Sequence, residues 1–260
     1  MSIPPAVTAL DMCWSSFDSL ISALDADQMR TQSLCPAWKV RDVVVHIGAI
    51  EHMLSGSAPG SMTAIPFEKV GAWMSEVGSL DDADLLTRYR EVIAARRAEV
   101  GSLTSSDLEL ASATPVGPGT YGKFMGIRVF DCWAHEQDVR VPLGLPGHQD
   151  GLAAEMAIDE IVRSLPYIVG KKVGLPDGMG ITIELAGPVQ RTMHVAVTGR
   201  AAVVDALESP DVVLTADSTT FALLACGRID PQGPIDDGRI AWTGDATWGD
   251  KAARSLAFTM

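Results

Sequence analysis

Residues 124–144 constrain the fold of this chain most, because they predict a helix that is apolar around most of its circumference. At 100° per residue, one stripe of this helix carries four polar side chains, those of Arg128, Asp131, His135 and Asp138. A carboxylate and an imidazole on a helix buried on several sides cost several kcal/mol unless they are paired, hydrogen-bonded or bound to a metal. The stripe therefore predicts a polar site inside a helical core.

Apolar residues recur at helical spacing in the rest of the first half of the chain. The pattern predicts long helices over residues 7–24, 38–54 and 81–100, a shorter one over 67–77, and a break at 114–119 that precedes the helix described above. Long antiparallel helices pack as a bundle, and bundle interiors commonly hold metal sites. We expect a four-helix bundle over residues 1–147.

The pattern changes after residue 147. A helix is predicted over residues 152–169, and alternating apolar and polar residues then predict a hairpin with strands at 180–185 and 193–197. The later elements are a strand at 212–215, a helix at 218–226, a strand at 239–242 and a C-terminal helix. This mixture predicts a smaller α+β domain. The chain is therefore divided into a bundle over 1–147 and an α+β domain over 148–260.

Composition narrows the classes of partner. The net charge of −13 over 260 residues disfavours nucleic acid and anionic membrane surfaces, and no apolar run approaches the roughly 18 residues that cross a bilayer. The first residues lack the pattern of a secretory signal, and the four cysteines form no CxxC pair. We expect a cytoplasmic protein with free thiols, either a monomer or a homodimer.

Three residues from two predicted helices form a candidate metal site. Asp131 and His135 are four residues apart on one helix face, and His46 lies on the inward row of the helix at 38–54. These three side chains could hold one divalent ion such as Zn²⁺, with a fourth position open. From spacing alone, a helix ion pair between Asp131 and His135 is the commoner arrangement.

Asp138 has two interpretations. It lies on the same stripe and could support a ligand or replace Asp131 as a ligand, or it could pair with Arg140 or Arg128.

Two segments resemble the mycothiol-dependent maleylpyruvate isomerase family of actinobacteria, within the DinB-like superfamily. The first is LCPAWKVRDVVVH at residues 34–46, and the second is RVFDCWAHEQDVRVPLG at residues 128–144. Residues 223–228 and 242–245 more loosely resemble the second domain of that family, which is similar to sterol-carrier folds. The resemblance implies a DinB-like bundle followed by a sterol-carrier-like α+β domain.

The resemblance also implies residue roles. It places a divalent metal, usually zinc, on His46, Asp131 and His135, although many members have Glu where this chain has Asp131. Arg228 resembles a family arginine that faces the metal cleft and would bind the carboxylate of a substrate. Asp138 and Trp38 are the residues expected beside the cofactor, Trp38 as a wall of the pocket.

The function that the resemblance implies is a metal-dependent thiol transferase or isomerase. It would use mycothiol, a small-molecule thiol, against a small electrophilic substrate in a cleft between the two domains. The protein cysteines are expected to lie away from the site, with Cys132 about 100° from the ligand stripe, so the nucleophile would come from solution.

Two alternatives are a non-catalytic small-molecule-binding protein and a DinB-like stress protein that keeps the metal without thiol chemistry. Metal content and thiol-dependent turnover distinguish them.

Overall fold

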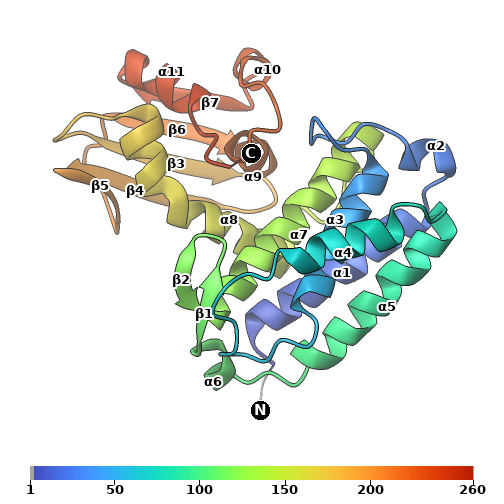
Figure 1. The fold of residues 1–260 in the computed structure, drawn as a ribbon. Coiled ribbons are helices and arrows are strands. Elements are labelled where there is room, and N and C mark those ends of the chain that lie inside the picture. The colour runs from blue at the N-terminus through green and yellow to red at the C-terminus, as the bar shows by residue number, and fades with distance from the viewer. Residues whose placement is uncertain (1–2, 260) are drawn as a thin grey trace. The chain divides into compact units, whose positions relative to one another are not determined.

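The computed structural model describes residues 3–259, and the chain divides into two compact units after His148. The first unit is helical and the second contains a sheet with helices on it (Figure 1). The expected class, a helical domain followed by an α+β domain, is confirmed.

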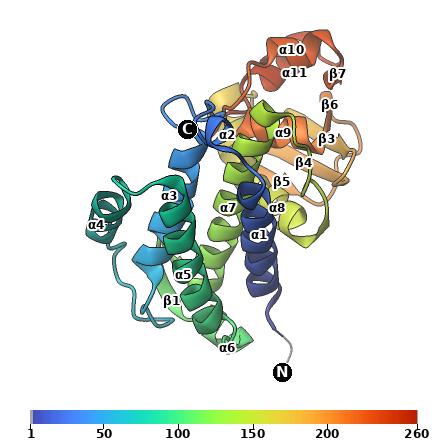
Figure 2. The same cartoon turned by 90° about the vertical axis from the view of Figure 1, so that its right-hand side faces the viewer.

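In the described part of the first unit, four long helices run side by side (Figures 1 and 2). They are α1 (Pro5–Ser22), α3 (Val40–Leu54), α5 (Asp82–Val100) and α7 (Tyr121–Leu143). Shorter elements connect them: α2 (Ala26–Met29), α4 (Glu68–Val77), α6 (Ser105–Leu108), β1 (Ala111–Thr114) and β2 (Gly117–Thr120). The bundle predicted from apolar spacing is present.

Local signals in the sequence set the ends of these helices. The side chain of Asp81 accepts a hydrogen bond from the backbone N–H of Asp84 at the start of α5, and Thr120 accepts one from Lys123 at the start of α7. Gly144 follows α7 with φ of 64°, a left-handed conformation that ends helices and that glycine adopts without strain. These caps place the polar stripe of α7 in the middle of a long helix.

The segment at 114–119, expected as a simple break, forms a hairpin. Strands β1 and β2 pair antiparallel from Ala111 with Thr120 to Thr114 with Gly117, so only Pro115 and Val116 lie between them. Gly117 has φ of 104°, which permits so tight a turn. The glycine and proline content hid these strands from a pattern of alternating side chains.

The second unit begins with α8 (Gly151–Tyr167), which continues into a π-helical turn, η1 (Ile168–Val173). Among the described residues of this unit, five strands form one sheet in the order β5-β4-β3-β6-β7. They are β3 (Gly180–Ala186), β4 (Arg191–Thr198), β5 (Arg200–Val204), β6 (Val212–Asp217) and β7 (Ile240–Gly244). The remaining helices are α9 (Ser218–Ala225), α10 (Gln232–Asp236) and α11 (Ala246–Arg254).

Strand pairing follows the predicted hairpin. Strands β3 and β4 are antiparallel, as expected, and β3 and β6 are parallel. Helix α8 packs on β4 and β5, and α11 packs on β6 and β7 (Figure 1). Strand β5 was not predicted, because its side chains are exposed or half-buried and show no apolar alternation.

Helix α4 is fixed to α3 by one tryptophan. Trp73 is completely buried, and its indole N–H donates to the backbone oxygen of Val45 at 3.1 Å. Gly48 on α3 leaves room for this ring, since a Cβ there would lie 2.8 Å from Cζ2 of Trp73. Close packing of α4 against α3 therefore depends on a glycine.

We expect Gly48→Ala to destabilise the first unit by about 1–3 kcal/mol, because the added methyl group displaces a buried ring. Gly71→Ala is the matched control: Gly71 lies on α4 with no neighbouring atom within 4 Å of the added Cβ, so this change should stabilise by up to about 1 kcal/mol. Urea unfolding followed by tryptophan fluorescence measures both. Equal midpoints for the two variants would contradict this packing.

Candidate metal centre

The structure brings His46 of α3 together with Asp131 and His135 of α7. One oxygen of Asp131 lies 3.6 Å from Nε2 of His46, and the other lies 3.7 Å from Nε2 of His135. The three ligand atoms all lie within 4.8 Å of one another. Two neighbouring helices thus direct one carboxylate and two imidazoles at a common point.

These separations suit a single divalent ion. Tetrahedral bonds of 2.0–2.2 Å require neighbouring donors to be about 3.3–3.6 Å apart, and the carboxylate oxygens of Asp131 lie close to that distance from both rings. Two imidazoles and one carboxylate are also a common zinc donor set with an open position.

Nε2 of His46 provides an independent observation. It is a buried atom with no hydrogen-bond partner among the described residues. Burial lowers the pKa of His46 below its usual value, although Asp131 acts in the opposite direction, so the ring is neutral at pH 7 and offers a lone pair. An unsatisfied buried nitrogen is costly, and an ion at this point would satisfy it.

Asp138 orients His135. Its Oδ2 lies 2.8 Å from Nδ1 of His135, and because a carboxylate only accepts, the proton is on Nδ1. Nε2 of His135 then carries a lone pair and faces Asp131. A carboxylate behind a histidine in this way is the usual support of a metal-bound imidazole.

Cys35 lies against the same carboxylate. Its Sγ is 3.0 Å from Oδ2 of Asp138 and 3.8 Å from Nδ1 of His135. We expected this cysteine to lie away from the site, and that prediction is wrong, because the structure places it beside Asp138 and His135. The backbone N–H of Leu34 donates to the backbone oxygen of Asp138, which holds the 34–36 segment against α7.

Cys35, His135 and Asp138 are also close enough to be considered as a metal set. Their donors are 3.0 and 2.8 Å apart, however, which is shorter than the separation around one ion and normal for hydrogen bonds. We therefore interpret this trio as a hydrogen-bonded support of His135.

A buried ion-pair network holds the carboxylate of Asp131. Nη1 of Arg128 donates to Oδ2 of Asp131 at 2.5 Å, and Nη2 donates to Oε1 of Glu51 at 2.8 Å. Glu51 also accepts from Nε of Arg96 at 3.2 Å. Glu51, Arg96 and Arg128 are almost completely buried. Burial raises the pKa of Asp131, but the charge of Arg128, with both histidines, outweighs it and holds the pKa well below its usual value.

Trp38 covers the histidines. Its ring centroid lies 4.8 Å from that of His46 and 5.4 Å from that of His135. It therefore forms an aromatic wall beside both imidazoles.

The other sequence candidates have contacts of their own. His52 stacks on Trp73 with centroids 5.2 Å apart. Arg228 follows α9 in the second unit, is half-buried, and donates from Nη1 to the backbone oxygen of Cys226 at 3.1 Å. Arg140 pairs with Glu136, and Arg128 pairs with Glu51 and Asp131.

Sequence reasoning missed Cys35, Glu51 and the Glu136–His148 pair, whose atoms lie 2.7 Å apart. The signal that could have identified Glu51 is a carboxylate among apolar residues on a predicted core helix. For Cys35, the sequence carries no spacing signal, because its position depends on a loop.

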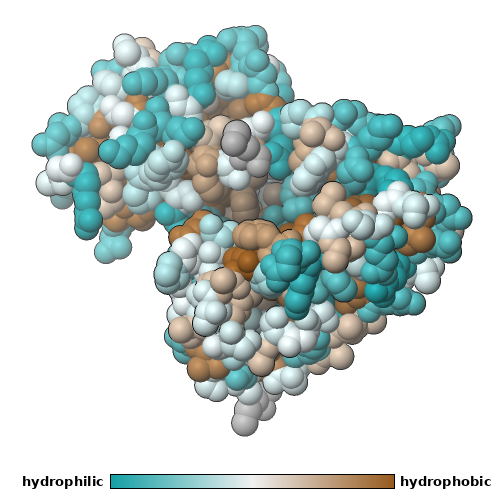
Figure 3. All heavy atoms as spheres, in the orientation of Figure 1, coloured by the Kyte–Doolittle hydropathy of each residue, from teal (hydrophilic) through white to brown (hydrophobic). Residues whose placement is uncertain are grey.

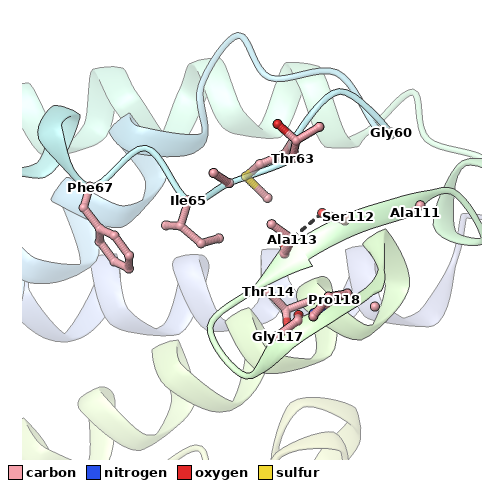
Figure 4. Close-up of a pocket in the computed structure, with 13 residues that line it drawn as sticks. Gly60, Thr63, Ile65, Phe67, Ala111, Ser112, Ala113, Thr114, Gly117 and Pro118 are labelled. Carbon is pink, nitrogen blue, oxygen red and sulfur yellow. Dashed lines mark hydrogen bonds between the residues drawn. The ribbon is translucent and has the colours of Figure 1, made fainter.

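A cavity of about 670 Å³ lies between the 60–67 segment and the β1–β2 hairpin, and none of the residues of this centre line it. In Figure 4, Ile65 and Phe67 face the hairpin that carries Thr114 and Pro118. Its lining contains no titratable side chain, so it offers no chemistry of its own.

No helix within residues 3–259 is long and apolar enough to cross a membrane. On the face drawn in Figure 3, hydrophobic residues form small patches among hydrophilic ones.

Two family models match the chain. The mycothiol maleylpyruvate isomerase N-terminal domain matches residues 10–140, which is half of the chain, and the MDMPI C-terminal domain matches residues 155–254. The chain belongs to the mycothiol maleylpyruvate isomerase family. The family resemblance of the two sequence segments is thus confirmed, and His46, Asp131 and His135 all lie in the N-terminal match.

Solved structures of this family have the same fold. A crystal structure of the mycothiol-dependent maleylpyruvate isomerase has 15% sequence identity and a TM-score of 0.57, covering 88% of this chain and 90% of that one. A mutant of that isomerase matches with a TM-score of 0.59 at the same identity and coverage. A search among curated proteins gave no significant match.

A sterol carrier protein 2 from Yarrowia lipolytica matches 40% of this chain and 92% of its own at 13% identity, with a TM-score of 0.30. A score this low supports no conclusion about the second unit.

The roles of the two carboxylates can be separated by substitution. Asp131→Glu should retain or strengthen zinc binding, since the longer side chain still reaches the ion. Asp138→Ala should weaken binding by about 10–100-fold, the usual effect of losing a partner behind a ligand, and Asp131→Ala should weaken it more. Competition with a chromogenic chelator measures each affinity. If Asp138→Ala is the more damaging change, the carboxylate ligand lies two turns later on α7.

Proposed function

We propose that this protein is a metal-dependent thiol transferase or isomerase that uses mycothiol on a small electrophilic substrate. The observation that carries the proposal is the convergence of His46, Asp131 and His135, with the unpartnered buried Nε2 of His46 directed at the common point. Membership of the family, whose name contains the thiol, supports mycothiol as the source of sulfur. Maleylpyruvate appears in the name of the family and of its solved members, and the substrate of this chain is argued from its own residues.

These residues would hold a divalent ion such as zinc, which would lower the pKa of a thiol that binds at its open position. Burial lowers the pKa of His46, so this ring is neutral at pH 7, and Asp138 takes up Nδ1 of His135 so that Nε2 is the atom left for the ion. Arg128 holds Oδ2 of Asp131 in place, so the carboxylate needs no rearrangement to bind. Trp38 packs beside both imidazole rings and restricts their movement.

The protein thiols are poor nucleophiles for this reaction. Cys13 and Cys132 are buried, and burial raises the pKa of each well above its usual value. Cys226 is buried in the second unit. We therefore infer that the reacting sulfur comes from solution, with Cys35 as a hydrogen-bonding neighbour of Asp138.

The proposal also includes a role for Arg228, a cellular location and an oligomeric state. Arg228 would bind a carboxylate of the substrate through its guanidinium. Reduced thiols persist in the cytoplasm, which is where we place the activity, in a monomer or a homodimer.

The test is consumption of mycothiol with a panel of electrophiles, using metal-loaded and chelator-treated protein. His46→Ala should lose metal and reduce turnover by at least about 100-fold, since it removes one of three ligands. His52→Ala is the matched control, because His52 lies on the same helix against Trp73 and should leave metal content and turnover unchanged.

Cysteine variants test the source of the sulfur. The triple change C13A/C132A/C226A should keep metal-dependent turnover, and Cys35→Ser, whose hydroxyl still donates to Asp138, should reduce it only in part. Turnover that persists after metal removal would refute the metal dependence, and turnover that disappears with Cys35→Ser would refute a thiol supplied from solution.

A further inference from the structure

A second, smaller cavity lies directly beside the candidate metal centre, between α3, α4 and the segment that precedes α3. Its volume is about 230 Å³. Six of its lining residues carry the inference: Trp38, Val45, His46, Ala49, Val70 and Met74. His46 and Trp38 belong to both places, so a molecule in this cavity contacts one of the three candidate ligands and the tryptophan beside them.

The wall of this cavity is fixed by the packing of α4. Trp73 is completely buried and bonded to the backbone oxygen of Val45, which is itself a lining residue. Arg41 donates to the backbone oxygen of Leu80 at 2.6 Å and to Asp82 at 3.1 Å, and so anchors the segment after α4. The width of the space between α3 and α4 is therefore fixed by these contacts within the first unit.

The chemistry of the lining selects an uncharged apolar group. Asp42 is the one charged residue among the described lining residues, and its Oδ2 already accepts from the backbone N–H of Lys39 at 2.8 Å. None of the described lining residues is Lys or Arg, so a dianion would lose its hydration without gaining a cation.

Size and polarity exclude the thiol as the occupant. An apolar cavity of about 150 Å³ holds benzene, so this volume accommodates one substituted ring or a short branched chain. The hydroxyl groups of a pseudo-disaccharide thiol would find almost no partners on an apolar lining. The sulfur donor must therefore approach the centre by another route.

We propose that the cavity between α3 and α4 binds the apolar, uncharged part of the electrophile, and that the preferred substrates carry an aromatic or branched aliphatic group at that end. This inference rests on the proposed thiol transfer and specifies its substrate class. With 1-chloro-2,4-dinitrobenzene as the probe, the thiol sulfur forms a bond to the ring carbon and the carbon–chlorine bond breaks. Chloride leaves with the bonding electron pair, and the thiol proton passes to solvent.

The first experiment measures binding without turnover. The unreactive ring 1,3-dinitrobenzene is titrated by equilibrium dialysis against the full chain, Val70→Phe and Ala72→Phe. Val70→Phe fills the cavity and should raise the Kd by about tenfold or more, while metal content is unchanged. Ala72 is exposed on the same helix and does not line the cavity, so Ala72→Phe should leave the Kd within about twofold.

A second variant tests the same point if Val70→Phe does not fold. Met74→Asp places a charge at the exposed edge of the lining, on a side chain that is 54% exposed, and should raise the same Kd by about tenfold. An unchanged Kd in both Val70→Phe and Met74→Asp would overturn the proposal. So would displacement of 1,3-dinitrobenzene by an equal concentration of maleate.

Turnover separates this inference from the proposed function. If the variants weaken 1,3-dinitrobenzene binding but the full chain consumes no mycothiol with 1-chloro-2,4-dinitrobenzene, the cavity assignment stands and the thiol transfer fails. If mycothiol is consumed with maleate and not with the aromatic electrophile, the thiol transfer stands and the assigned substrate class is wrong.

Discussion

The buried guanidinium of Arg128 is the contact on which the candidate centre depends. It bonds to Glu51 on α3 and to Asp131 on its own helix, and Glu51 also accepts from Arg96 on α5. Three of the four long helices are thus joined by charges that water does not reach. Removing one partner of such a network costs about 3–5 kcal/mol, because the other charge stays buried without compensation.

This contact also sets the register of α3 against α7. His46 lies five residues before Glu51, which is about 7.5 Å along α3, and Asp131 and His135 lie three and seven residues after Arg128, about 4.5 and 10.5 Å along α7. When Glu51 meets Arg128 on antiparallel helices, His46 therefore falls between Asp131 and His135. One register of α3 against α7 therefore produces both the ion-pair network in the core and the cluster of His46, Asp131 and His135.

Much of this arrangement was predictable from the sequence, because apolar spacing on a helix is a local property. The polar stripe of α7 correctly placed Arg128, Asp131, His135 and Asp138 on one face, and the row of α3 placed His46 inward. The shorter carboxylate of Asp131 reaches both histidines because Arg128 holds it. The convergence itself was an expectation that spacing could not distinguish from a helix ion pair.

Long-range contacts were not predictable in the same way. Cys35 reaches Asp138 because the backbone of Leu34 bonds to α7, and no local pattern encodes a bond over so many residues. The cavity beside His46 exists because Gly48 admits Trp73, which only the packed structure shows. Strand β5 and the β1–β2 hairpin lack the apolar alternation that identifies strands from sequence.

The most direct measurement is the absorption spectrum of the full chain with Co²⁺ in place of zinc, before and after mycothiol is added. The account predicts a spectrum without sulfur-to-cobalt charge transfer at first, since the ligands are two imidazoles and a carboxylate, and a new charge-transfer band in the near ultraviolet on addition of the thiol. His46→Ala should show neither bound cobalt nor the band. A charge-transfer band already present before mycothiol, and lost in Cys35→Ser, would show instead that Cys35, His135 and Asp138 hold the metal.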